Sequence, residues 1–138
     1  MTTTRLRRSE LSTPGTNEKM MAKAAASAAD LVFLDLEDSV APAEKKAARA
    51  LVADALVTHD WGTTTRALRI NGVHTPWAYG DLIDVVTRAG GALDVVIVPK
   101  VKAPRDVWFV ETLLDQLEAD LGLGRRIGIE VLIEETEA

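Results

Sequence analysis

The chain contains no cysteine among its 138 residues. This absence excludes disulfide bonds, metal sites built from thiolates and catalysis by a cysteine nucleophile. Dense runs of lysine or arginine are also missing, and 21 acidic against 16 basic residues give a formal net charge of −5. We therefore expect no nucleic-acid partner, and an anionic ligand has to be bound by a few placed cations rather than by a general positive field.

Long apolar runs are absent as well, and the longest fall far short of the roughly 20 residues that span a bilayer. Arg5, Arg7 and Arg8 are followed by polar residues rather than by the apolar core of a signal peptide. We expect a soluble cytoplasmic protein without a membrane partner. With 47% hydrophobic and 27% charged residues, the composition is ordinary for a single globular domain, here residues 1–138.

The most informative stretch runs from Leu31 to Asp38, an apolar segment that becomes acidic at its far end. Pro42 and a helical pattern follow it, which predicts a buried parallel strand leading into a helix. Side chains alternate across a strand, so Asp35 and Glu37 share one face while the other face is entirely apolar. Functional sites of open α/β sheets and barrels lie at the carboxyl ends of their strands, so we expect the chemistry there.

Strand and helix patterns alternate along the whole chain. This alternation predicts a parallel sheet with right-handed crossovers. One strand face is apolar and the other is mixed and partly charged, which favours a barrel wall. A (β/α)8 TIM barrel takes about 250 residues, so this chain corresponds to roughly its first five strands and four helices, an incomplete barrel. The strands are expected at 6–12, 31–37, 65–71, 94–100 and 126–134, with helices beginning near Asn17, Pro42, Pro76 and Val107.

Charged residues gather at the predicted strand ends: Asp35, Glu37, Asp38, Arg69, Lys100, Glu130 and Glu134. Carboxylate ligands suit a hard cation such as Mg²⁺. An arginine beside such a site can bind a substrate carboxylate through two parallel hydrogen bonds. A metal ion and an arginine together can stabilise the enolate formed next to a 2-oxo acid.

Several short motifs carry a resemblance to a known family. In chain order they are Arg8-Ser9 with Thr13-Pro14-Gly15, Asp35-Leu-Glu-Asp-Ser-Val40 followed by Lys45 and Arg49, Arg69-Ile70-Asn71, Pro99-Lys100-Val101, and Ile133-Glu134. Each motif alone is weak. In this order and over nearly the whole chain, they resemble the HpcH/HpaI aldolase and citrate lyase β-subunit family, especially its CoA-ester lyases such as malyl-CoA lyase.

The resemblance implies a TIM barrel with Mg²⁺ at the strand ends. It implies a lyase that breaks or forms a carbon–carbon bond in a CoA thioester such as malyl-CoA or citryl-CoA, giving an oxo acid and an acyl-CoA. Arg69 would hold the oxo-acid carboxylate, Glu134 the metal, and Arg8 would lie beside the substrate and CoA. Glu37 and Asp38 would line the same site and complete the catalytic set. The family also implies a homo-oligomer, because its C-terminal region completes a neighbouring subunit's site.

Two departures from the family pattern bear on activity. Glu135 stands where the family usually has threonine, and Ala138 where it has glycine. The second metal-ligand aspartate belongs to a later strand, and Glu130 is the alternative to Glu134 as a ligand. Two other functions therefore stay open, namely a CoA-independent 2-oxo acid aldolase and a non-catalytic half-barrel that acts only by association.

Each candidate residue also has a structural interpretation. Asp35 and Glu37 could cap the following helix or pair with nearby cations, and Arg69 could be the partner of either carboxylate. Lys100 could form a Schiff base, although an ion pair is favoured. Arg8 could be an ordinary surface charge.

Overall fold

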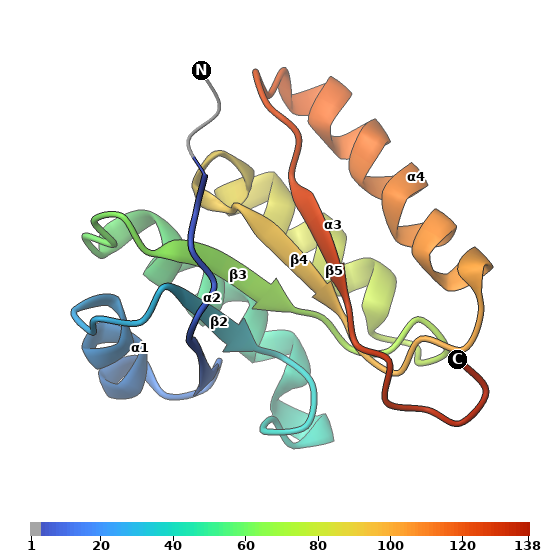
Figure 1. Ribbon diagram of the computed structural model, residues 1–138, viewed down its shortest axis with the longest axis horizontal. Helices are drawn as coiled ribbons and strands as arrows, with labels where there is room; N and C mark the ends of the chain where they lie inside the picture. Colours follow the sequence, from blue (N-terminus) through green and yellow to red (C-terminus); the bar gives the residue numbers. More distant parts are fainter. Residues whose placement is uncertain (1–3) are drawn as a thin grey trace.

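Five parallel strands form one sheet in the computed structural model, which describes residues 4–138. The strands lie side by side in chain order, and each pairs in parallel with the next (Figure 1). The predicted parallel order is therefore confirmed. The bounds are Glu10–Pro14 (β1), Leu31–Asp35 (β2), Thr65–Arg69 (β3), Val95–Val98 (β4) and Gly128–Val131 (β5).

A helix follows each of the first four strands, and these helices cover one side of the sheet (Figure 1). The four helices expected from the periodicity are thereby confirmed. Within the described residues, none of them combines the length and the apolar character that a membrane span requires. The bounds are α1 (Glu18–Ala25), α2 (Lys45–Thr58), α3 (Ala78–Ala89) and α4 (Pro104–Leu121), with short 3-10 turns η1 (Pro42–Glu44) and η2 (Gly90–Ala92).

Local side-chain chemistry explains where the helices begin and end. The Asn17 side chain accepts a hydrogen bond from the backbone N–H of Met20 at 3.0 Å, as expected of a residue that caps α1. Asp106 reaches back to accept the backbone N–H of Lys102 at 2.8 Å at the start of α4. Gly122 ends α4 with a φ of 62°, a left-handed conformation that glycine adopts without strain.

The first strand lies further along the chain than the sequence predicts. The expected range is 6–12, whereas the backbone pairs with β2 only over Glu10–Pro14. The strand therefore includes Pro14. Proline is tolerated there because N–H groups that face β2 alternate along the strand, and the neighbouring Gly15 N–H is the one that donates to the Asp35 carbonyl, at 2.8 Å, so the Pro14 nitrogen faces away from β2.

The ladders of β2 and β3 end two residues earlier than expected, at Asp35 and Arg69. In both cases the backbone N–H two residues after the end of the strand donates to a side-chain carboxylate instead of to a neighbouring strand. Asp35 accepts the backbone N–H of Glu37 at 2.9 Å, and Asp81 accepts that of Asn71 at 2.9 Å. The chain is drawn away from the sheet at these points, so Glu37 and Asn71 lie in loops beyond the strand ends.

The two faces of the sheet have different chemistry, as the alternation predicts. The helix-covered face forms the main core, in which strand residues Val32, Leu34, Leu68, Ile70, Val96 and Val98 pack with Met21, Val52, Leu82 and Leu114 from the helices. The opposite face holds a small cluster of Leu31, Ala67, Val95 and Ile97. Charged side chains continue this second face towards the strand ends, which is the arrangement of a barrel interior.

Candidate functional site

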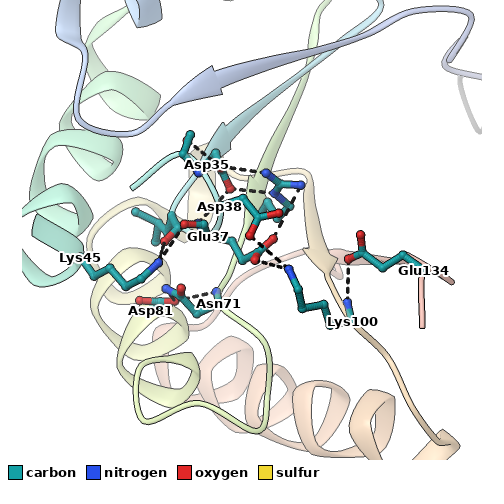
Figure 2. A network of polar contacts seen from close by, with 11 residues as sticks. Asp35, Glu37, Asp38, Lys45, Asn71, Asp81, Lys100 and Glu134 are labelled. Atoms are coloured by element: carbon teal, nitrogen blue, oxygen red, sulfur yellow. Dashed lines mark hydrogen bonds and ion pairs between the residues drawn. The ribbon is translucent and has the colours of Figure 1, made fainter. Parts of the chain in front are cut away.

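The carboxyl ends of β2, β3 and β4 bring together charged residues that are far apart in the sequence (Figure 2). Asp35 ends β2, Arg69 ends β3, and the strand register places them side by side. The Nε and Nη2 atoms of Arg69 donate to the two carboxylate oxygens of Asp35 at 2.7 and 2.9 Å. Arg69 is therefore an ion-pair partner of Asp35, which is the structural interpretation that the sequence offered beside substrate binding.

Asp35 also organises the loop that follows β2. Besides the Glu37 N–H, it accepts the backbone N–H of Ser39 at 2.9 Å and the Ser39 hydroxyl at 2.5 Å. Burial alone would raise the pKa of Asp35, but the hydrogen bonds from Arg69, Ser39 and Glu37 outweigh it and lower the pKa to about 2. Asp35 is thus a fully bonded carboxylate that fixes the geometry of its neighbours.

This pKa predicts how the stability depends on pH. A carboxylate with a pKa of about 2 in the folded state stabilises the fold above its unfolded value of 3.8, and the effect is lost as the pH falls from about 4 to 2. The contribution is about 2 kcal/mol. We expect Asp35→Asn to lose this amount at pH 7 and to match the wild type near pH 2, in urea unfolding at each pH. A constant difference between the two proteins over this range would contradict the assignment.

The Nη1 atom of Arg69 is the part of its guanidinium group that is not bonded to Asp35. Its Nη1 atom lies 3.8 Å from Glu37 Oε1, which is too far for a hydrogen bond. The Phe33 ring lies 5.1 Å from the guanidinium carbon and supports the group from the side. Arg69 is therefore held rigidly by Asp35 and Phe33, while Nη1 makes no hydrogen bond to any residue in the described part of the chain.

Glu37, Asp38 and Lys100 form the second part of the site. Lys100 Nζ lies 2.5 Å from Glu37 Oε2 and 3.2 Å from Asp38 Oδ1. The other oxygen of Glu37, Oε1, is buried without a hydrogen-bond partner among residues 4–138. Burial and the adjacent Asp38 raise the pKa of Glu37 against the opposing effect of Lys100. Glu37 is therefore the carboxyl group of this cluster that holds a proton most readily.

The direction of Lys100 depends on an unusual backbone conformation. Strand alternation alone would place Lys100 in the apolar row of Val96 and Val98, but its φ is +52°. This left-handed conformation is strained for a residue with a side chain, and it accompanies the turn of the ammonium group towards Glu37. Hydrogen bonds from the ammonium to Glu37 and Asp38 raise the pKa of Lys100. A protonated amine is not a nucleophile, so the geometry supports the ion pair rather than the Schiff base.

The two candidate metal ligands on and after β5 lie in different places. Glu134 follows the strand and its Oε1 accepts the backbone N–H of Lys100 at 2.9 Å. Glu130 lies within β5 and pairs with Arg7 at 2.6 Å, away from Lys100. Among residues 4–138 there is no group of three or more histidine, aspartate or glutamate side chains that could hold a metal ion. The described residues thus provide Glu134 as a single candidate ligand and not a complete metal site.

The structure does not bring Arg8 to this site. Arg8 precedes β1 and donates from Nε and Nη2 to Asp30, both at 3.0 Å. Asp30 precedes β2, so this pair lies at the amino ends of the parallel strands, opposite Arg69. This position separates Arg8 from the other candidate residues, because a residue before a parallel strand lies at the far end of the sheet from the residues after it. Its role beside the substrate stays a prediction.

Sequence reasoning assigned no role to the buried cations of α2. Lys45 Nζ donates to the carbonyl oxygens of Leu36 and Glu37 at 3.0 and 2.8 Å. One turn later on the same face, Arg49 Nε donates to Asp81 Oδ1 at 2.8 Å. The signal was present in the sequence, because both cations fall in the same helical stripe as the apolar core residues of this helix.

Asp81 of α3 completes this buried network. It is fully buried, and its second oxygen accepts both the backbone N–H and the side-chain amide of Asn71, at 2.9 and 2.7 Å. Arg49 also donates to the carbonyl oxygen of Trp77 at 3.1 Å. The loops after β2 and β3 are therefore held to the helices by side chains that lie outside the cluster formed by Asp35, Glu37, Asp38, Arg69 and Lys100.

Comparison with known proteins gives consistent results. A sequence model of the HpcH/HpaI aldolase/citrate lyase family matches residues 8–138. An L-malyl-CoA/beta-methylmalyl-CoA lyase of Cereibacter sphaeroides is 43% identical over 127 residues, which cover 92% of this chain and 40% of the relative. Citrate lyase subunit beta of Leuconostoc mesenteroides is 39% identical over 122 residues, covering 88% and 39%. The chain thus spans about two fifths of the length of these relatives.

Solved structures show the same architecture. A citrate lyase from Burkholderia xenovorans superimposes with a TM-score of 0.87 at 20% identity, over 96% of this chain and 42% of that one. The citrate lyase beta subunit of M. tuberculosis, complexed with oxaloacetate and magnesium, gives 0.67 at 31% identity, over 97% and 52%. The predicted fold, an incomplete TIM barrel, is confirmed.

Proposed function

The chain belongs to the HpcH/HpaI aldolase/citrate lyase family, and from this we propose that it supplies part of the active site of a carbon–carbon lyase. The substrate is a CoA thioester such as malyl-CoA or citryl-CoA, which is cleaved to an oxo acid and an acyl-CoA, or formed from them. The observation that carries the proposal is the geometry of Arg69, which is fixed on one edge by Asp35 while Nη1 makes no hydrogen bond within the described chain.

Arg69 is proposed to bind the carboxylate of the oxo-acid portion. A guanidinium group has five N–H donors, and here only Nε and Nη2 are bonded to Asp35. The hydrogens of Nη1 can therefore donate to a ligand carboxylate without breaking the Asp35 pair. Such charge-assisted bonds are about twice as strong as neutral ones, and the rigid support means that little side-chain freedom is lost on binding.

Glu37 and Asp38 are proposed to line the reacting end of the substrate. Breaking the carbon–carbon bond requires the hydroxyl proton to leave as the oxygen becomes a carbonyl, while the bonding electrons pass to the thioester enolate. The buried and unbonded Oε1 of Glu37 can accept that hydroxyl hydrogen, and the raised pKa of Glu37 suits a group that takes up a proton. Asp38 and Lys100 hold the opposite side of the Glu37 carboxyl group.

Mg²⁺ is the proposed cofactor, supported by the M. tuberculosis relative that was solved with magnesium and oxaloacetate. Glu134 is the proposed ligand from this chain. Because Mg²⁺ favours six oxygen ligands and no cluster of candidate ligands occurs in residues 4–138, this segment does not form the magnesium site by itself.

Ligand-induced stabilisation tests the proposal against its alternatives. At a malyl-CoA concentration of 100 times Kd, the protein should gain about 2.7 kcal/mol of stability, measured by thermal melting with and without Mg²⁺. Stabilisation by glyoxylate or oxaloacetate but by neither malyl-CoA nor CoA would favour the CoA-independent aldolase. If none of these ligands has an effect, the catalytic proposal fails and only association is left.

A homo-oligomer is also proposed. The proposal is supported by the resemblance to the family, whose C-terminal region completes a neighbouring subunit's site. The mass of the particle in solution, measured by light scattering across a concentration series, tests this directly. A monodisperse monomer at all concentrations would contradict it.

A further inference from the structure

We propose that Lys45 is a positioning residue for the site, which directs the main chain of Glu37 and Asp38 so that their carboxylates face Arg69 and Lys100. The inference rests on the proposed function for the identity of the reacting groups. The positioning role itself is argued from the contacts of Lys45 alone, so this role and the proposed function can be tested separately.

The environment of the Lys45 ammonium group is unusual. The residue is only 6% exposed, yet no carboxylate of the described residues lies within ion-pair distance of Nζ. Its contacts are the carbonyl oxygens of Leu36 and Glu37 and the Trp77 ring, whose centroid is 5.1 Å away. Taking a charge out of water is costly unless its donors are satisfied. An apolar residue of similar size would avoid that cost, so packing alone does not explain a lysine here.

The two carbonyl groups mark the point where the chain leaves the sheet. Leu36 still donates its N–H to the Arg69 carbonyl at 3.0 Å, whereas the Glu37 N–H is bonded to the Asp35 side chain. The ladder ends at this step, so the following carbonyl groups need other donors. Lys45 donates to both carbonyl groups at once, and the Glu37 carbonyl also accepts the Val40 N–H at 3.2 Å. Lys45 is thus the donor that links the two peptide planes next to the Glu37 side chain.

The loop is thus held from two sides. Lys45 holds its main chain from the helix-covered side, and Lys100 holds its carboxylates from the substrate-facing side (Figure 2). Arg49 contributes indirectly, because its bond to the Trp77 carbonyl fixes the residue whose ring covers the Lys45 ammonium group. Without Lys45, the Glu37 carboxyl group would keep its ion pair with Lys100, but the main chain that sets the direction of the Glu37 side chain would lose the hydrogen bonds from Lys45.

The test uses Lys45→Met, Lys45→Arg and the control Lys46→Met, which alters an exposed lysine one position along the same helix. Hydrogen exchange of the Glu37, Ser39 and Val40 amides reports on the loop, and the amides of α4 report on the fold as a whole. We expect Lys45→Met to lower the protection factors of the loop amides by at least about tenfold, after the change in global stability measured at the α4 amides has been subtracted. Oxo-acid affinity should fall by a similar factor. Lys46→Met should change neither.

Two results for Lys45→Met would overturn the proposal. Unchanged loop protection in Lys45→Met would show that Lys45 does not position the loop, and equal loss at the loop and in α4 would show a purely global role. If Lys45→Met does not fold, Lys45→Arg decides the question, because it keeps the charge but changes the donor geometry, and unchanged loop exchange and affinity in that variant would contradict positioning. If the wild type binds no oxo acid, the proposed function fails, while the exchange data still decide the role of Lys45.

Discussion

Replacing Arg69 by methionine is expected to lower oxo-acid affinity and thioester cleavage by at least about 30-fold, because removing a hydrogen-bonded charged anchor costs about 2–5 kcal/mol. The measurement is the dissociation constant for glyoxylate or oxaloacetate by calorimetry, with turnover of malyl-CoA in the assembled enzyme. The variant also leaves Asp35 without its cation in a buried position. Folding must therefore be verified in each sample, since breaking a buried pair is itself destabilising by about 3–5 kcal/mol.

The same strand offers a matched control. Arg66, at the other end of β3, donates from Nε and Nη2 to Asp94 at 3.1 and 3.3 Å, just as Arg69 does to Asp35. We expect Arg66→Met to leave ligand affinity within about twofold, because Asp94 keeps Arg5 as a partner at 2.8 Å and lies far from the proposed site. Equal loss of affinity in both variants would show that the Arg69 effect is structural rather than specific.

Arg69→Lys separates charge from shape. The lysine retains a cation beside Asp35 but has no fork with which to hold Asp35 and a ligand together. We expect a folded protein that still lacks most of the oxo-acid affinity. Normal affinity in this variant would mean that the proposed carboxylate anchor is a different residue.

Asp81→Leu is expected to lower the free energy of unfolding by about 3–5 kcal/mol, because the substitution leaves the Arg49 cation and the Asn71 amide without their buried partner. Urea unfolding measures the difference. Asp84→Ala provides the control, since Asp84 contacts the same Arg49 at 3.1 Å but its side chain is 51% exposed. An exposed pair of this kind should contribute less than about 1 kcal/mol.

The double variant Arg49→Met with Asp81→Leu tests the cause of this loss. If the cost of Asp81→Leu comes from an unpaired buried cation, removing that cation should restore part of the stability, with a coupling energy of about 1–3 kcal/mol. Additive losses would show instead that the two residues act through separate contacts, with no coupling energy between Arg49 of α2 and Asp81 of α3.

Much of the fold follows from patterns that are local in the sequence. Apolar alternation and the caps at Asn17 and Gly122 predict five parallel strands joined by four helices. The strand ends are less accurately predicted, because side chains distant in sequence set them. The Asn71 N–H donates to Asp81 rather than to a neighbouring strand, and no residue near Asn71 in the sequence indicates this bond. Sequence periodicity reports on burial, whereas the end of a ladder depends on competition for individual hydrogen bonds.

The site follows the same division. Asp35 and Arg69 meet because neighbouring parallel strands align their ends, which the sequence order alone implies. Lys100 faces Glu37 only because its φ is positive, and a lysine gives no indication of that conformation in the sequence. Lys45 points inward through helix geometry, which the spacing of the core residues does indicate, but its carbonyl partners depend on the loop conformation.

The strand order of this sheet also has a consequence for biosynthesis. Among the described strands, each of β2 to β5 pairs with the strand that precedes it in the chain. As the polypeptide leaves the ribosome from its N-terminus, every new βα unit meets an edge that is already exposed and complementary. The Asp35–Arg69 pair joins the second unit to the third, so both of its residues have been synthesised before β4 and β5 exist.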